Sequence, residues 1–378
     1  MVRKELETLV NLIEVFLINP ETINRIKIFK KVFMLREFHT GIIFDPVFLK
    51  HNQPGHPENA KRLESIISGL KEKGLLDKVN QLKSHLAEIE EIEVCHTKEY
   101  VEYVKEYCEK GGGYFDPDTY ANRHSFIAAA TAVGGSIDLV KAIITGELKN
   151  GFALLRPPGH HALASRSMGF CLFGNIALAA KVALLQPSIS KVAIVDFDVH
   201  HGNGTQAIVG DDPNILFISS HQYPFYPGTG SIREIGQGNA EGTIVNIPLQ
   251  DGTGDNGFKT VYEKIVLPSV ERFQPDLILV SAGFDAHWDD PLANLNLSLT
   301  GYNWISRELI KSAERICSGK IIFFLEGGYN LQVLSNGVAN SIRGLLGIES
   351  FEDPLGQSNT PEPDISKLIS DLIKIHKL

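Results

Sequence analysis

Residues 192–202, VAIVDFDVHHG, combine an apolar run with a cluster of ionisable side chains. The first four residues predict a buried strand. Beyond them, Asp196, Asp198 and His200 share one face where the strand meets solvent, because strand side chains alternate with period two. Two neighbouring carboxylates are costly unless a cation compensates their charge. Asp and His together suit zinc, so the segment predicts a metal site, with an acid-lined loop as the alternative.

Outward from this stretch, apolar runs typical of strands alternate with amphipathic runs typical of helices. Strands are expected at 41–44, 152–155, 191–197, 215–219, 243–247, 277–281 and 321–325. Helices are expected at 58–75, 98–110, 126–144, 176–185, 257–273, 302–317 and 338–346, with a loop after the glycines at 111–113. Apolar strands separated by helices indicate parallel pairing. The sequence therefore predicts an α/β fold, a single three-layer domain with a central, mostly parallel sheet flanked by helices.

Polar, glycine-rich loops follow four of these strands. They are 156–161 (RPPGHH), 196–202 (DFDVHHG), 282–285 (AGFD) and 326–330 (EGGYN). Ligands of open parallel sheets bind outside the carboxyl ends of the strands. We therefore expect these four loops to gather around one site.

Composition limits the functional classes. The chain has 378 residues, a formal net charge of -9 and 43% apolar residues, which is ordinary for a protein with a substantial core. The negative charge argues against general nucleic-acid binding. Four cysteines without Cys-x-x-Cys spacing favour a reducing, cytoplasmic setting. No long uninterrupted apolar run is present, so no membrane span is expected.

Several motifs together resemble the histone deacetylase superfamily, which includes prokaryotic acetylpolyamine amidohydrolases and acetoin-utilisation proteins. The motifs are RPPGHHA (156–162), GFCLFGNIALAA (169–180), VDFDVHHGNGT (195–205), YPGTG (226–230), SAGFDAH (281–287) and EGGYN (326–330). Their order and spacing match the family from about residue 40 to about residue 347. Asn203 and the Asp-Ala-His at 285–287 are more similar to the class II and prokaryotic branch.

The resemblance implies one zinc ion per chain, held by Asp198, His200 and Asp285. Three protein ligands leave one coordination position of the zinc open for water and the substrate carbonyl. Zinc lowers the pKa of such a bound water to about 7. Iron or cobalt in place of zinc stays open. Asp196, with backbone oxygens of 198 and 200 and with Ser219, would also match a structural K⁺ site.

The resemblance also implies the catalytic groups. His161 would be the general base and then the acid for the leaving amine, while His160 would support the transition state. Asp196 would orient His160, and Asn203 would orient His161. Tyr329 would donate its hydroxyl to the developing oxyanion.

A substrate tunnel is implied as well. Gly169, Phe170 and Tyr226 match aromatic walls that flank the methylene chain of acetyl-lysine, and Asp118 would contact the substrate at the rim. Two rings bury such a chain at little entropic cost. Leu292 falls where polyamine-selective relatives carry an acid, which favours a neutral amide. His56-Pro57-Glu58 and Arg62 would organise the entrance.

The chain would divide into three parts. Residues 1–39 are expected to form a helical N-terminal extension, 40–350 the deacetylase-like catalytic domain, and 351–378 a link and a short helix. Acidic residues interrupt the apolar stretch at 5–18, unlike a secretory signal. The extension would bind to a surface or take part in forming a homo-oligomer. The alternative is that Met34 is the natural start of the chain.

The expected activity is zinc-dependent amide hydrolysis that removes acetyl or similar acyl groups. The substrates would be acylated lysine in proteins or peptides, or an acetylated small amine. One alternative is a catalytically silent protein that binds acylated lysine. Another is a two-metal ureohydrolase of the arginase type, which needs more carboxylates than the Asp-Ala-His at 285–287 supplies. A regulatory deacetylase in acetoin or acetyl-coenzyme A metabolism would use the same chemistry.

Overall fold

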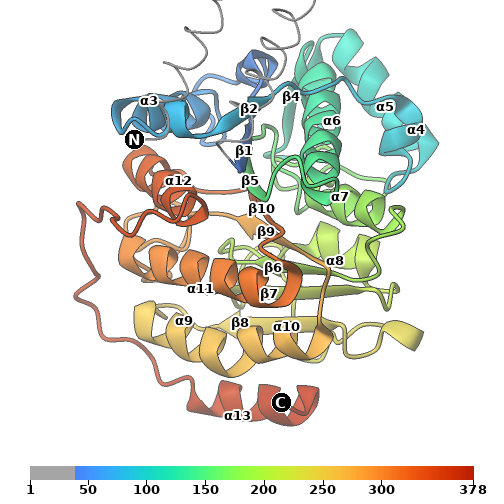
Figure 1. Ribbon diagram of the computed structural model, residues 1–378. Helices are drawn as coiled ribbons and strands as arrows, with labels where there is room; N and C mark the ends of the chain where they lie inside the picture. The colour runs from blue at the N-terminus through green and yellow to red at the C-terminus, as the bar shows by residue number, and fades with distance from the viewer. Residues whose placement is uncertain (1–38) are drawn as a thin grey trace, which may run out of the picture.

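A central parallel sheet organises the computed structural model, which describes residues 39–378 (Figure 1). Its eight strands lie in the order β2-β1-β5-β10-β9-β6-β7-β8, and every pairing between them is parallel. The strands are β1 (Thr40–Ile43), β2 (Asn80–Leu82), β5 (Asn150–Ala153), β6 (Val192–Asp196), β7 (Ile215–Gln222), β8 (Ile244–Leu249), β9 (Leu277–Ala282) and β10 (Ile321–Leu325). The predicted N-terminal extension lies outside the described residues except for His39.

Helices cover both faces of this sheet (Figure 1). They are α3 (Lys61–Glu72), α4 (Ile89–Ile92), α5 (Lys98–Glu109), α6 (Ser125–Ile144), α7 (Asn175–Leu184), α8 (Asn203–Val209), α9 (Asp255–Val261), α10 (Leu267–Phe273), α11 (Leu299–Cys317), α12 (Leu331–Leu345) and α13 (Ser366–His376). Helices α6, α7 and α8 pack together on one side, whereas α3, α12, α11 and α9 form the other layer. The predicted three-layer α/β fold is confirmed.

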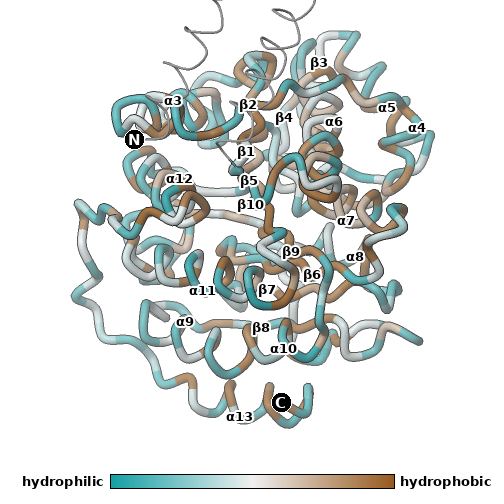
Figure 2. Tube along the Cα trace, in the orientation of Figure 1, coloured by the Kyte–Doolittle hydropathy of each residue, from teal (hydrophilic) through white to brown (hydrophobic). Residues whose placement is uncertain are grey.

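The core lies between these layers. Every residue of β5, β6, β7, β9 and β10 is buried. Figure 2 shows hydrophobic residues concentrated in these central segments. Burial on both faces explains why these strands lack the polar alternation of a half-exposed sheet.

Helix α6 is the most apolar long helix of the described chain. Its 20 residues are long and apolar enough to cross a membrane, but 78% of its most apolar window is buried inside the protein. Rows of small residues such as Ala128 and Gly135 let it approach α7 and the sheet closely. Here α6 is a core helix of the domain.

Several local elements differ from the sequence-based expectation, among them the unpredicted short helices α4 and α8. The segment after Gly111 forms an antiparallel hairpin of β3 (Gly112–Tyr114) and β4 (Tyr120–Asn122), not a loop. The short edge strand β2 was not predicted because it has only three residues, one exposed between two half-buried ones, and these carry no clear pattern. Helix α12 begins at Leu331 rather than 338, because the Asn330 side chain accepts hydrogen bonds from the Gln332 and Val333 amides and caps it.

Candidate active site

Four neighbouring strands deliver the polar loops to one edge of the sheet. Strands β5, β10, β9 and β6 are adjacent and parallel, so their carboxyl ends lie side by side. The loops that follow them carry the histidine pair, Tyr329, Asp285 and Asp198. The expected gathering of these loops around one site is confirmed.

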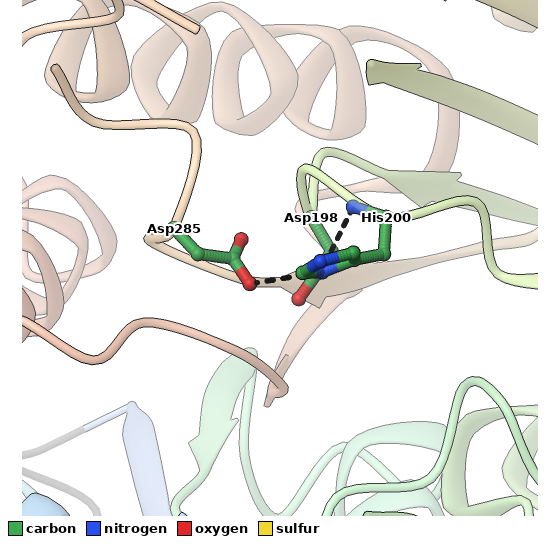
Figure 3. A group of neighbouring side chains, drawn as sticks. All are labelled: Asp198, His200 and Asp285. Atoms are coloured by element: carbon green, nitrogen blue, oxygen red, sulfur yellow. Dashed lines mark hydrogen bonds and ion pairs between the residues drawn. The ribbon is translucent and has the colours of Figure 1, made fainter. Parts of the chain in front are cut away.

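Asp198, His200 and Asp285 form a compact group of potential metal ligands. One ligand atom from each lies within 4.8 Å of the others. His200 Nδ1 is 3.2 Å from Asp198 Oδ1 and 3.3 Å from Asp285 Oδ2. Figure 3 shows the imidazole and the Asp285 carboxylate turned toward each other. Among residues 39–378, this is the one group of at least three such side chains close enough to share an ion.

The arrangement of this triad fits a tetrahedral metal. Ligands about 2.0–2.2 Å from zinc must lie roughly 3.3–3.6 Å apart, which is close to the two distances from His200 Nδ1. Asp285 Oδ1 accepts a hydrogen bond from the Val199 amide, and Asp198 Oδ2 accepts one from the Gly327 amide. Asp285 Oδ2 is buried and accepts no hydrogen bond from the described residues. Backbone amides thus orient both carboxylates and leave oxygens for an ion.

The charge of the triad also suits a cation. Burial opposes protonation of His200, but its interactions with the carboxylates of Asp198 and Asp285 outweigh burial and raise its pKa to about 9. The space between the three groups therefore has a strongly negative potential. A metal ion binding there would displace a proton, as is usual for such ligands.

The two histidines of the 156–161 loop have different partners. His160 Nδ1 lies 3.1 Å from Asp196 Oδ2, and His161 Nδ1 lies 2.7 Å from Asn203 Oδ1. The rings are 4.0 Å apart between centroids, and both residues are buried. The predicted pairings of these four side chains are present in the structure.

These partners separate the acidities of the two rings. Burial opposes protonation of His160, but the carboxylates of Asp198 and Asp196 outweigh it and raise its pKa to about 10. Burial and the neighbouring His160 and His200 lower the pKa of His161 well below its ordinary value. At neutral pH the pair thus consists of a cationic His160 and a neutral His161.

Tyr329 stands on a turn that only small residues allow. A Cβ added to Gly327 would collide with Asp285 Oδ2, and Gly328 has a φ of +114°. The Tyr329 amide donates to Asp290 Oδ2 at 2.7 Å. The ring packs edge-on against Phe170, 5.9 Å away. Tyr329 is thereby held beside the metal triad and at the pocket wall.

The pocket has a volume of about 260 Å³ and contains the predicted substrate-contacting residues. Its lining includes Asp118, Gly169, Phe170, Tyr226 and Leu292, together with His160, His161, His200 and Tyr329. Asp196 and Asn203 lie behind the histidines rather than in the lining. All residues predicted for the site therefore belong to one constellation.

Some contributing residues received no role from the sequence. Phe225 lines the pocket and stacks on His200 with centroids 5.5 Å apart. Glu326 Oε2 accepts the amide hydrogens of Gly159 and His160, and burial raises the pKa of Glu326 to about 7. The sequence did contain a signal for the role of Glu326, because a carboxylate directly follows the buried strand β10.

Two further predictions concern the surroundings of this pocket. His56 reaches the rim, where its Nε2 lies 2.9 Å from the Asp118 carbonyl oxygen. Glu58 and Arg62, expected at the entrance, are instead fully buried. Ser219 Oγ lies 2.9 Å from His221 Nδ1, and the K⁺ site stays a prediction.

Comparisons with known proteins agree with this architecture. Residues 56–345 match the histone deacetylase domain family. The chain is 40% identical to histone deacetylase 14, chloroplastic, of Arabidopsis thaliana, over 87% of this chain and 83% of that protein. It is 42% identical to a probable deacetylase of Archaeoglobus fulgidus, over 78% of this chain and 82% of that protein.

Solved structures extend this agreement to the fold. The crystal structure of the HDA15 HD domain superposes with a TM-score of 0.82 at 37% identity, covering 90% of this chain and 95% of that one. The family match alone spans well over half of the chain. The chain therefore belongs to the histone deacetylase family.

Proposed function

We propose that this protein is a zinc-dependent deacetylase that hydrolyses the amide bond of acylated lysine. Membership of the family supports deacetylase activity. The observation that carries the finer proposal is one pocket lined by a potential metal ligand, two differently charged histidines and Tyr329. Each of these groups is needed for hydrolysis with activated water.

Asp198, His200 and Asp285 would hold the ion. A zinc ion bound there would supply a Lewis acid for the amide carbonyl and would lower the pKa of water. Their donor set of two carboxylates and one imidazole suits zinc, and three ligands leave a position open. Iron and cobalt accept similar ligands, so elemental analysis of the purified protein is needed to identify the bound metal.

Proton transfer falls to His161. Asn203 Oδ1 can only accept, so the hydrogen bond between them places the imidazole proton on Nδ1. Nε2 of His161 is then free to take a proton from the attacking water and to pass it to the leaving amine. The lowered pKa of His161 keeps this atom unprotonated before the reaction.

Positive charge and a hydroxyl would stabilise the transition state. The carboxylates of Asp198 and Asp196 favour the cationic form of His160, which would act electrostatically without releasing its proton. The Tyr329 hydroxyl would donate to the oxygen on which negative charge develops. Donors fixed in a buried site need little reorganisation during the reaction, which makes them effective.

The walls of the pocket are suited to a substrate with a narrow, uncharged chain. Phe170 and Tyr226 would flank the four methylene groups of lysine, and Leu292 adds apolar surface. Asp118 lies at the exposed rim, where its carboxylate would receive amide hydrogens of the substrate backbone. These features favour acyl-lysine over a polycationic amine.

The alternative functions have less support. The described residues hold a single potential metal group, whereas arginase-type chemistry needs two adjacent ions. A silent acyl-lysine-binding protein would have no need for the base and the oxyanion donor that this pocket retains. No feature of the described residues favours either alternative.

The test is acetate release from zinc-loaded protein, measured by mass spectrometry on a panel of acetyl-lysine peptides and acetylated polyamines. We expect hydrolysis of peptides and its loss in His161→Ala. The matched control is His124→Ala, an exposed histidine outside the site. Release by His161→Ala at the wild-type rate, or no release by wild type from any substrate, would contradict the proposal.

A further inference from the structure

Three fully buried charges form a cluster beside the pocket. Glu58, Arg62 and Arg156 all have 0% exposed surface. Arg156 donates to both carboxylate oxygens of Glu58, through Nη2 to Oε2 at 2.7 Å and through Nε to Oε1. Arg62 Nη1 donates to Glu58 Oε1 at 3.2 Å. One carboxylate thus links two guanidinium groups.

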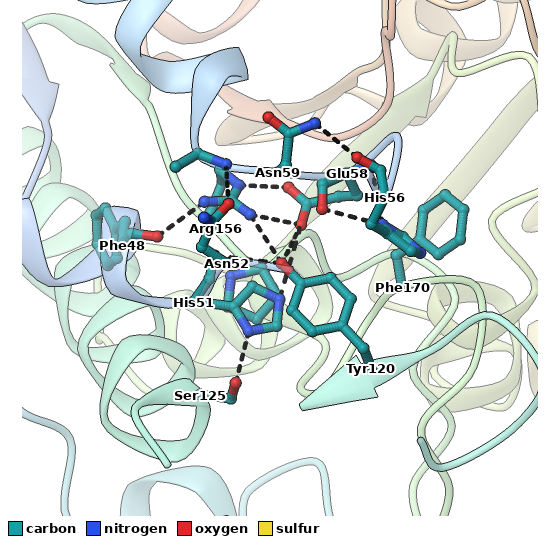
Figure 4. A network of polar contacts seen from close by, with 12 residues as sticks. Phe48, His51, Asn52, His56, Glu58, Asn59, Tyr120, Ser125, Arg156 and Phe170 are labelled. Atoms are coloured by element: carbon teal, nitrogen blue, oxygen red, sulfur yellow. Dashed lines mark hydrogen bonds and ion pairs between the residues drawn. The ribbon is translucent and has the colours of Figure 1, made fainter. Parts of the chain in front are cut away.

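Aromatic and polar side chains enclose this carboxylate. Figure 4 shows the Glu58 carboxylate beside Arg156 and close to the Tyr120 hydroxyl, with His51 stacked on the Tyr120 ring. The Tyr120 hydroxyl is 3.1 Å from Arg156 Nη2 and 3.4 Å from Glu58 Oε2. Burial would raise the pKa of Glu58, but Arg156 and Arg62 outweigh burial and lower it to about 2. Glu58 is therefore ionised at neutral pH.

The first guanidinium belongs to the loop of the histidine pair. Arg156 begins the 156–161 loop, four residues before His160. It also donates to the Phe48 carbonyl oxygen at 2.9 Å. Its contacts with Glu58 therefore fix the point at which the loop leaves strand β5.

The second guanidinium holds the Tyr329 turn. Arg62 Nε donates to the Gly328 carbonyl oxygen at 2.8 Å, and Nη2 donates to the Glu326 carbonyl oxygen. Its guanidinium carbon lies 5.1 Å from the centre of the Tyr329 ring, within the range of a cation–π contact. One side chain thereby contacts the backbone before Tyr329 and the ring itself.

We propose that Glu58 is a positioning residue that fixes the histidine loop and Tyr329 relative to each other through Arg156 and Arg62. This inference rests on the proposed function, because it concerns the geometry of that reaction. The planar guanidinium groups suit the role, since each offers several donors in fixed directions. Stability alone gives a weak reason for the cluster, because apolar residues often replace buried ion pairs without loss.

The test uses substitutions that preserve charge or shape. Arg62→Lys keeps a cation near Glu58 but cannot reach both carbonyl oxygens and the ring together. We expect its kcat to fall about 10- to 100-fold, as for small displacements of catalytic groups. KM and bound zinc should stay within about twofold, because the substrate walls and metal ligands are untouched. Glu58→Gln removes the negative charge and replaces one acceptor oxygen by an NH2 donor, so it weakens the contacts with the guanidinium groups and should lower kcat at least as much.

A double-mutant cycle separates positioning from general stabilisation. In a Tyr329→Phe background, Arg62→Lys should lower kcat by less than about threefold, since no hydroxyl remains to be misplaced. Equal fold losses in both backgrounds would overturn the proposal, as would a wild-type kcat in folded Arg62→Lys. Mass spectrometry of the deacetylated peptide follows turnover even in the slow variants.

Controls keep the two proposals apart. Glu64→Gln removes an exposed charge from the same helix and should retain the wild-type kcat. If Glu58→Gln fails to fold, the double-mutant cycle of Arg62→Lys and Tyr329→Phe alone tests the positioning role. Wild-type protein inactive on every substrate would refute the proposed function and this inference together. Active wild type with unaffected Arg62→Lys would refute the inference alone.

Discussion

The imidazole of His161 and the amide of Asn203 form a hydrogen bond in which Nδ1 lies 2.7 Å from Oδ1. The amide is neutral, so it orients the ring without stabilising its cationic form. Asn203→Asp would place a negative charge there and should raise the kinetic pKa of the base by about one unit or more. The acidic limb of the kcat/KM profile then moves to higher pH, because His161 must be neutral to act.

A pH–rate profile on an acetyl-lysine peptide checks this expectation. Asn214→Asp, which adds the same charge at an exposed loop position, serves as the control and should leave the profile unchanged. An identical profile for Asn203→Asp and wild type would mean that His161 is not the group that titrates.

Tyr329→Phe should lower kcat by about 100- to 1,000-fold, the usual effect of losing one oxyanion donor. The phenyl ring would keep the contacts with Phe170 and Arg62, so folding and substrate binding should persist. Single-turnover kinetics and a binding titration with an acetyl-lysine peptide separate the two effects. Tyr114→Phe, at an exposed site, is the matched control. Nearly full activity in Tyr329→Phe would rule out its hydroxyl as the donor.

Asp285→Asn should reduce bound metal from about one ion per chain to a small fraction, because an amide oxygen is a poorer ligand for zinc than a carboxylate. Elemental analysis after dialysis measures the metal directly and does not depend on turnover. Asp289→Asn, four residues further along the same loop and exposed, should keep its metal. Equal metal content in both variants would place the ion elsewhere.

Much of this site was predictable because its polar residues lie in short sequence motifs that directly follow apolar strands. The proximity of Asp198 and His200 at the end of a strand was predictable, although β6 already ends at Asp196, and parallel strands brought Asp285 to the same edge. The resemblance to a family supplied the distinction between His160 and His161, which their sequence alone does not contain.

Other features could not be predicted, because they depend on contacts between distant segments. Glu58 joins Arg156 across 98 positions, and Arg62 reaches Gly328 across 266. The resemblance to a family placed Arg62 at the entrance, and a charged residue in an amphipathic helix normally indicates an exposed face, so its sequence carried no signal of burial. The division of the chain at residues 39 and 350 stays a prediction.

Acid should destabilise the protein in part through Glu58. Its pKa falls from the ordinary 4.5 to about 2 in the folded state, because Arg156 and Arg62 outweigh burial. A depressed pKa contributes stability that is present above the unfolded value and is lost as pH falls from about 4.5 toward 2. At neutral pH, Glu58→Gln should lower the free energy of unfolding by about 3–5 kcal/mol.

Urea unfolding of wild type and Glu58→Gln at several pH values tests the linkage. The difference between the two proteins should shrink as the pH is lowered from 6 to 3. Glu64→Gln, exposed on the same helix, should differ from wild type by less than about 0.5 kcal/mol throughout. A Glu58→Gln difference that does not change with pH would show that Glu58 is not ionised in the folded protein.

Glu362 anchors the C-terminal segment to the body of the domain. Its carboxylate accepts amide hydrogens from Gly254, Asn256 and Gly257 at 2.8–3.0 Å and so caps the start of α9. Removing such a cap typically costs about 0.5–2 kcal/mol. Glu362→Ala should therefore lower the free energy of unfolding by about this amount, measured in urea at neutral pH.

The control is Glu349→Ala. The Glu349 carboxylate forms an exposed ion pair with Arg307 at 3.6 Å, and its removal should change the free energy of unfolding by less, because exposed ion pairs contribute little. Equal losses in the two variants would mean that the cap contributes no more than a surface ion pair.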